Sequence, residues 1–139
     1  MHRKILVAND GSGGAAKALT AAIALARQAK AELHMICVEE LPRFPTSVEE
    51  VIEEKQEASH RFTEVTAKAT AEAKLHRIKL TAHVSAGHAV PRIVEAIEQH
   101  HFDLLVVGFM GHTALYNRLI GGTTDRLVEM APCSVLVVK

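Results

Sequence analysis

Hydrophobic positions in this chain gather in five short runs, separated by longer segments in which apolar and polar residues alternate with a helical period. The runs cover residues 5–8, 33–38, 78–84, 104–107 and 135–138. The sequences LLVV and VLVV are nearly continuous and rich in β-branched residues. Such runs are typical of strands that are covered on both faces in a parallel sheet. We therefore predict a strand in each run.

The segments between the runs carry apolar residues at the 3.6-residue spacing of an amphipathic helix. Two clear stripes consist of Leu19, Ala22, Ile23 and Ala26, and of Val90, Ile93, Val94 and Ile97. The longest segment, 47–75, opens with SVEE, in which Ser47 can cap a helix and Glu50 can complete a capping box. Strand–helix alternation closed by a fifth strand predicts an α/β fold, an open doubly wound five-stranded parallel sheet with helices on both faces.

Composition and charge narrow the functional classes. The chain has 139 residues, 48% of them hydrophobic, which fits one domain spanning 1–139. Sixteen basic and sixteen acidic residues cancel, and aromatic residues make up 4% with no Trp, so we expect neither nucleic acid nor a membrane surface as partner. We see no apolar run near the about 20 residues that span a bilayer, no signal-peptide layout and no disulfide framework from two cysteines. We expect a cytoplasmic protein.

Glycines mark the segment 108–124, GFMGHTALYNRLIGGTT. In doubly wound sheets, ligands bind beyond the carboxyl ends of the strands, which directs attention to the predicted loops 9–14, 39–46, 85–88 and 108–122. Gly121 and Gly122 precede TTDRLVEMA, a predicted short helix with threonine caps, and free N–H groups at a helix start attract phosphate. The segment is neither a Walker loop nor a dinucleotide fingerprint. Spacing alone leaves open whether the glycines bind a phosphate or are ordinary turn residues.

The spacing G-x2-G-x9-G followed by hydroxyl residues resembles the nucleotide loop of universal stress proteins. The segments KILVANDGS, ELHMICVEE, AGHAVPRIVEAIEQHHFDLLVVG and APCSVLVVK are also similar to that family, so the resemblance covers nearly the whole chain. It implies the fold of universal stress proteins and adenine-nucleotide alpha-hydrolase-like domains. It further implies a domain that binds ATP, or ADP or AMP, and a homodimer that forms through the C-terminal strand, 135–138.

The resemblance also assigns residues to the nucleotide. The ten positions are Ala8, Asn9, Asp10, Val38, Gly108, Gly111, Gly121, Gly122, Thr123 and Thr124. Asp10 would bind the ribose or a Mg²⁺ on the phosphates, the two residues before it would lie along the adenine, and Val38 would close over the base. The glycines would let the backbone approach ribose and phosphate, and the two threonines would help to cradle the phosphates.

Two positions depart from the family pattern. Gly122 stands where similar proteins usually have a hydroxyl residue, and Phe109-Met110 replaces a small polar residue followed by a basic one. A lost charge-assisted hydrogen bond would weaken phosphate binding by about 1.5–3 kcal/mol, roughly one to two decades in affinity. Arg118 could replace the basic residue, or it could be a solvated helix residue. ATP is therefore the leading ligand, with ADP or AMP as alternatives.

Other chemistry receives less support. His34 and His83 are expected to approach each other across neighbouring strands, but we find no third metal ligand by spacing. No Lys or Arg stands next to a glycine of this motif to stabilise a transferring phosphate, so at most weak ATP hydrolysis is expected. The leading hypothesis is a dimeric, nucleotide-binding regulatory protein that acts on an unidentified protein partner. A nucleotide-free dimeric interaction module and a slow ATPase remain as alternatives.

Overall fold

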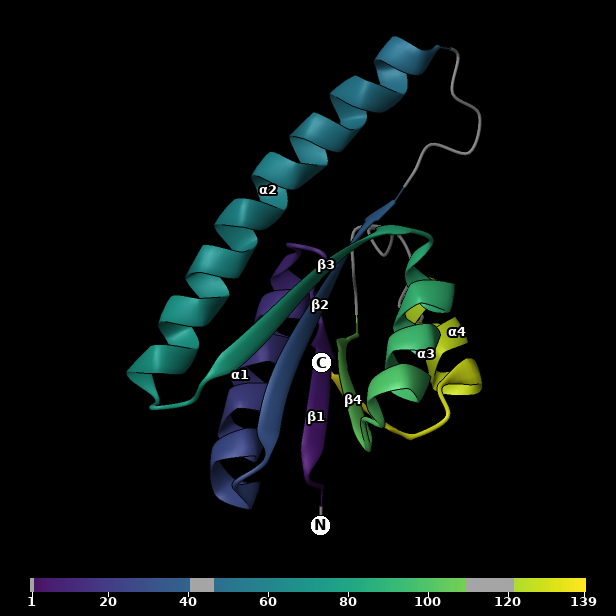
Figure 1. The fold of residues 1–139 in the computed structure, drawn as a ribbon. Helices are drawn as coiled ribbons and strands as arrows, with labels where there is room; N and C mark the ends of the chain where they lie inside the picture. The colour runs from purple at the N-terminus through teal and green to yellow at the C-terminus, as the bar shows by residue number, and fades with distance from the viewer. Residues whose placement is uncertain (1, 41–46, 110–121) are drawn as a thin grey trace.

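The computed structural model describes residues 2–40, 47–109 and 122–139. Along the chain the elements are β1 (Lys4–Ala8), α1 (Gly13–Ala29), β2 (Glu32–Glu40), α2 (Val48–Leu75), β3 (Leu80–Gly87), α3 (Ala89–His100), β4 (Leu104–Gly108), α4 (Gly122–Met130) and β5 (Ser134–Val138). The strands form one parallel sheet in the order β3-β2-β1-β4-β5 (Figure 1). The predicted open, doubly wound α/β fold is confirmed.

Helices cover both faces of the sheet, with α1 and α2 on one side and α3 and α4 on the other (Figure 1). Successive residues of a strand point to opposite faces. In β1, Ile5 and Val7 therefore join the cluster under α1 and α2, whereas Leu6 joins the cluster under α3 and α4. All three side chains are buried, which explains why this strand is apolar at every central position.

Some predicted ends of β2 and β3 were wrong. β2 continues through Glu40 and β3 through Gly87, although 39–46 and 85–88 were expected to be loops. The parallel ladder simply continues, with Val38 opposite Ser85 and Glu40 opposite Gly87. β3 also begins at Leu80 rather than at residue 78, because the N–H of Ile78 donates to the Ala73 carbonyl at the end of α2.

Helix α2 begins as the sequence predicts. The Ser47 hydroxyl accepts a hydrogen bond from the Glu50 N–H at 3.1 Å, so Ser47 is the N-cap. Only the later part of the helix packs on the sheet, where Phe62 is buried. The earlier part projects past the ends of the strands (Figure 1), and Val48 and Ile52 are 76% and 49% exposed there. No helix within the described ranges combines the length and apolar character needed to cross a bilayer.

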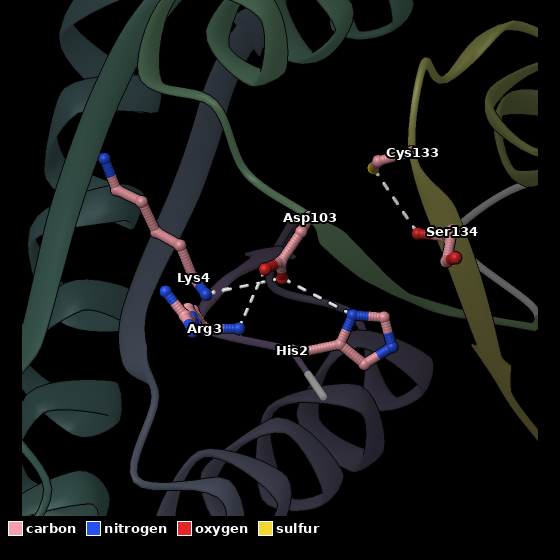
Figure 2. A network of polar contacts seen from close by, with 6 residues as sticks. All are labelled: His2, Arg3, Lys4, Asp103, Cys133 and Ser134. Atoms are coloured by element: carbon pink, nitrogen blue, oxygen red, sulfur yellow. Dashed lines mark hydrogen bonds and ion pairs between the residues drawn. The ribbon is translucent and has the colours of Figure 1, made fainter.

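A polar network joins the amino ends of β1 and β4 (Figure 2). The Asp103 carboxylate accepts hydrogen bonds from the N–H groups of Arg3, at 2.8 Å, and Lys4, at 3.3 Å, and lies 3.4 Å from His2 Nδ1. Partial desolvation alone would raise the pKa of Asp103, but the two N–H groups and His2 hold it below its usual value. This network holds the edge of the sheet opposite to the carboxyl ends of the strands.

Candidate functional site

A cavity of about 400 Å³ lies at the carboxyl ends of β1, β2 and β4. β1 lies between β2 and β4, so the strand order reverses there, which is the place where doubly wound sheets bind ligands. Seven of the ten residues assigned from the sequence line this cavity: Ala8, Asn9, Asp10, Val38, Gly108, Thr123 and Thr124. Gly122 is described but is not part of the wall, and Gly111 and Gly121 lie outside the described residues, as does Arg118.

The turn after β1 is built by two short polar side chains. Asn9 is 7% exposed; its Oδ1 accepts the Gly11 N–H at 2.9 Å, and its Nδ2 donates to Met35 Sδ at 3.4 Å. Its side-chain amide is therefore committed to protein groups, although it was expected to lie along the adenine. Asp10 is exposed at the cavity, and its Oδ1 accepts the Ser12 N–H at 2.9 Å. Such Asx turns hold a carboxylate at a defined place.

Gly108 is required by a close approach of two backbones. A Cβ at this position would lie 2.6 Å from the carbonyl carbon of Gly14 and 2.7 Å from its oxygen. The end of β4 thus packs directly against the first turn of α1. This glycine shapes the cavity by bringing that turn close, in addition to any contact that it makes with a ligand.

The first turn of α4 differs from the prediction. The helix begins at Gly122, so the threonines lie inside the first turn and not at the cap. The Thr124 hydroxyl donates to the Gly108 carbonyl at 2.8 Å, and Thr124 is only 7% exposed. Its proton is thereby withheld from a ligand. The N–H groups of the turn lack intrahelical acceptors, as at any helix start, and Thr123 is exposed beside them.

Several parts of the wall escaped the sequence analysis. Ile93 from α3 and Leu127 from α4 make the cavity apolar on one side, while Arg61 and Phe62 from α2 line it on another. Glu40, at the end of β2, adds a second carboxylate to that of Asp10. The sequence predicted the apolar stripe of α2, but it did not predict that this helix would lie beside the cavity.

A histidine pair lies away from this cavity. His34 Nδ1 and His83 Nε2 are 2.9 Å apart, which confirms the expected approach across β2 and β3. Within the part of the chain that the structure describes, no group of three or more His, Cys, Asp or Glu side chains is placed to hold a metal ion. Burial lowers the pKa of both imidazoles, and positive charge from Lys4 acts in the same direction. His100 also lowers both pKa values, whereas Glu32 opposes the shift at His34.

We expect this pair to make the protein less stable in acid. The folded state holds both histidines below their ordinary pKa of 6.5, so the unfolded chain binds protons more tightly. The stabilisation is complete above that value and is lost as the pH falls through the lowered pKa values. The free energy of unfolding should therefore fall as the pH is lowered from about 8 to about 5.

Urea unfolding across this range would measure the effect. His83→Gln should flatten the pH dependence, because it removes one titrating partner. His60→Gln is the matched control, since His60 is 81% exposed and, among the described residues, forms an ion pair only with Glu64 on the same helix. Parallel pH profiles for all three proteins would contradict the assignment.

The fold and the cavity together define an open α/β protein with a ligand-sized site at the reversal point of its sheet. A family model described as "Universal stress protein family" matches residues 1–139. The chain belongs to the universal stress protein family.

Individual relatives match all or nearly all of this chain and most of their own length. The chain is 30% identical over 148 residues to universal stress protein MJ0531 of Methanocaldococcus jannaschii, covering 100% of this chain and 83% of that protein. Universal stress protein UspA from Lactobacillus plantarum superposes with a TM-score of 0.88 at 23% identity, covering 99% and 98% of the two chains.

Two further solved structures carry ligands. A universal stress protein in complex with cAMP superposes with a TM-score of 0.78 at 22% identity, covering 99% and 97% of the chains. A family protein from Arabidopsis thaliana with AMP bound superposes with a TM-score of 0.70 at 16% identity, covering 99% and 91%. At these identities the superpositions establish a shared fold.

Proposed function

We propose that this protein binds an adenine nucleotide, ATP first of all, in the cavity at the carboxyl ends of β1, β2 and β4. The observation that carries the proposal is that seven residues assigned from the sequence line one cavity of about 400 Å³. The cAMP and AMP complexes of proteins with the same fold support it. The apolar wall around Val38 and Ile93 suits the base, and the first turn of α4 offers N–H groups to phosphate.

A Mg²⁺ that accompanies the nucleotide would find an oxygen donor in Asp10. This carboxylate is exposed at the cavity, and hard divalent ions prefer carboxylate and phosphate oxygens. The role of Asp10 in this proposal is to hold the ribose or the metal-bound phosphates, and its Asx turn pre-orients it for either contact.

The functional unit in this proposal is a homodimer formed through β5. This strand lies at the edge of the sheet, next to β4, and Leu136 on it is 38% exposed. Unpaired edge strands are ready to pair with another chain, so a second copy of β5 would cover both the edge and the leucine. Nucleotide occupancy would then be read by a protein partner on the dimer surface.

A specific observation favours the alternative of an interaction module without nucleotide. The Thr124 hydroxyl donates its hydrogen bond to the Gly108 carbonyl, and Gly122 has no hydroxyl. The part of the cavity proposed to hold the phosphates therefore offers fewer side-chain donors than the family pattern. If that loss outweighs the N–H groups of α4, the protein would act through its surface alone.

Calorimetric titration of nucleotide-stripped protein with ATP, ADP and AMP, each with and without Mg²⁺, separates the two. We expect ATP to bind and Asp10→Asn to weaken it about ten- to hundredfold, because the charge is lost while an amide oxygen can still accept the Ser12 N–H. Glu129→Gln is the control, since this exposed carboxylate lies near the end of α4, away from its first turn, and is not part of the wall. If no nucleotide binds at millimolar concentration, the nucleotide-binding proposal is contradicted and the interaction module is supported instead.

A further inference from the structure

Arg61 lies on α2 and lines the same cavity as Asp10 and Thr123. Among the described residues of the wall it is the only one with a positive charge, whereas Asp10 and Glu40 are negative. A nucleotide phosphate brings further negative charge into this space. Some cation must offset it, and the segment Phe109-Met110 lacks the basic residue of the family pattern.

The backbone of Arg61 is well anchored. The adjacent Phe62 is 1% exposed in the core, and the guanidinium carbon of Arg61 lies 4.6 Å from the centre of that ring. Two residues earlier, the Ser59 hydroxyl donates to a Glu39 carboxylate oxygen at 3.1 Å, which ties this turn of α2 to β2. The side chain of Arg61 thus starts from a fixed point beside the cavity.

The guanidinium itself is available. Arg61 is exposed, and within the ranges that the structure describes it forms neither an ion pair nor a hydrogen bond. Its contact with the Phe62 ring leaves the N–H groups of the guanidinium without a hydrogen-bond acceptor among the described residues, so they can still donate. The cation–π contact with Phe62 is weak at an exposed site, so the guanidinium can leave the ring at a small cost in free energy when an anion approaches.

The buried thiol of Cys37 lies within electrostatic reach of both Asp10 and Arg61. Burial raises the pKa of Cys37 to about 11. The Asp10 carboxylate raises it further, and the Arg61 guanidinium lowers it. Both charges therefore act on the same buried thiol.

We propose that Arg61 is a specificity-determining residue that binds a phosphate group of the nucleotide and so selects nucleotides over nucleosides. The inference rests on the proposed function, since it needs a nucleotide in this cavity. A guanidinium presents paired N–H groups that match phosphate oxygens, and such charged hydrogen bonds are the strong ones. The long helix α2 thereby supplies a cation in place of the basic residue that Phe109-Met110 lacks.

Calorimetric titration of the full chain with ATP, AMP and adenosine tests this proposal. Arg61→Gln should weaken ATP binding about ten- to hundredfold while leaving adenosine binding unchanged, because only the phosphate contact is lost. Arg61→Lys keeps the charge above Phe62 but loses the paired N–H groups, so its ATP affinity should be intermediate. Lys68→Gln is the control, since this exposed cation on α2 is not part of the wall.

The possible results separate the inference from the proposed function. A wild-type protein that binds none of the three ligands would overturn both. Wild-type binding of ATP that Arg61→Gln leaves unchanged would overturn the inference alone. Equal losses for ATP and adenosine in Arg61→Gln, with unaltered thermal unfolding, would move Arg61 to the adenosine side and also overturn it.

Discussion

Replacing Phe62 by alanine is expected to lower the free energy of unfolding by about 3–5 kcal/mol. Phe62 is 1% exposed and, among the residues that the structure describes, is the only aromatic one in the cluster under α1 and α2. The other fully buried contributions of α2 to that cluster are Ala69 and Ala73, which bring little apolar surface. Truncation would therefore leave a large cavity at the point where the long helix is attached to the sheet.

Urea unfolding, followed by circular dichroism, would measure this loss. Val48→Ala on the same helix is the control, because Val48 is 76% exposed and its truncation should change stability by no more than about 0.5 kcal/mol. Similar losses in the two variants would show that α2 is not attached through Phe62. Since Phe62 also lines the candidate site, a folded Phe62→Ala protein should bind nucleotide more weakly.

Gly108→Ala is expected to cost about 1–3 kcal/mol or more, because it forces extra volume into a closed contact. The new Cβ would lie 2.6 Å from backbone of Gly14, and backbone cannot rotate away as a flexible side chain can. Either β4 or the first turn of α1 must shift. Both border the candidate site, so nucleotide affinity should fall together with stability.

Gly13→Ala provides the matched comparison one residue from the contact partner. Nothing lies within 4 Å of a Cβ at Gly13, which is the first residue of α1. Alanine there should be neutral or stabilising by about 0.4–1 kcal/mol, because it restricts the unfolded chain. Thermal and urea unfolding of both variants would measure the contrast. A Gly108→Ala protein as stable as the Gly13→Ala protein would refute the packing role of Gly108.

The local pattern was sufficient for the order and type of the elements. Five apolar runs became five strands and the capping sequence at Ser47 became the start of α2, because side-chain burial on a strand or helix follows from residue spacing alone. The predicted ends of β2 and β3 were wrong because a strand continues as long as its neighbouring strand offers hydrogen-bond partners. Glu39 and Ser85 are polar, yet each has a paired neighbour in the next strand.

The candidate site divides in the same way. Asp10, Val38 and Gly108 could be assigned to one place because parallel strands put their carboxyl ends at one edge, and the family resemblance supplied their roles. The hydrogen bond from the Thr124 hydroxyl to the Gly108 carbonyl depends on the angle at which α4 packs on the sheet. No local sequence pattern predicts that angle.

By itself, the sequence determined the fold class, the family and the edge of the sheet at which a ligand would bind. These follow from periodicity, turn residues and a motif, all of which are local in the chain. Only the tertiary structure decided that α2 brings Arg61 and Phe62 to that edge, and that Gly108 must be glycine because of Gly14. Contacts between segments far apart in the chain depend on how helices cross a twisted sheet, and no local spacing encodes that geometry.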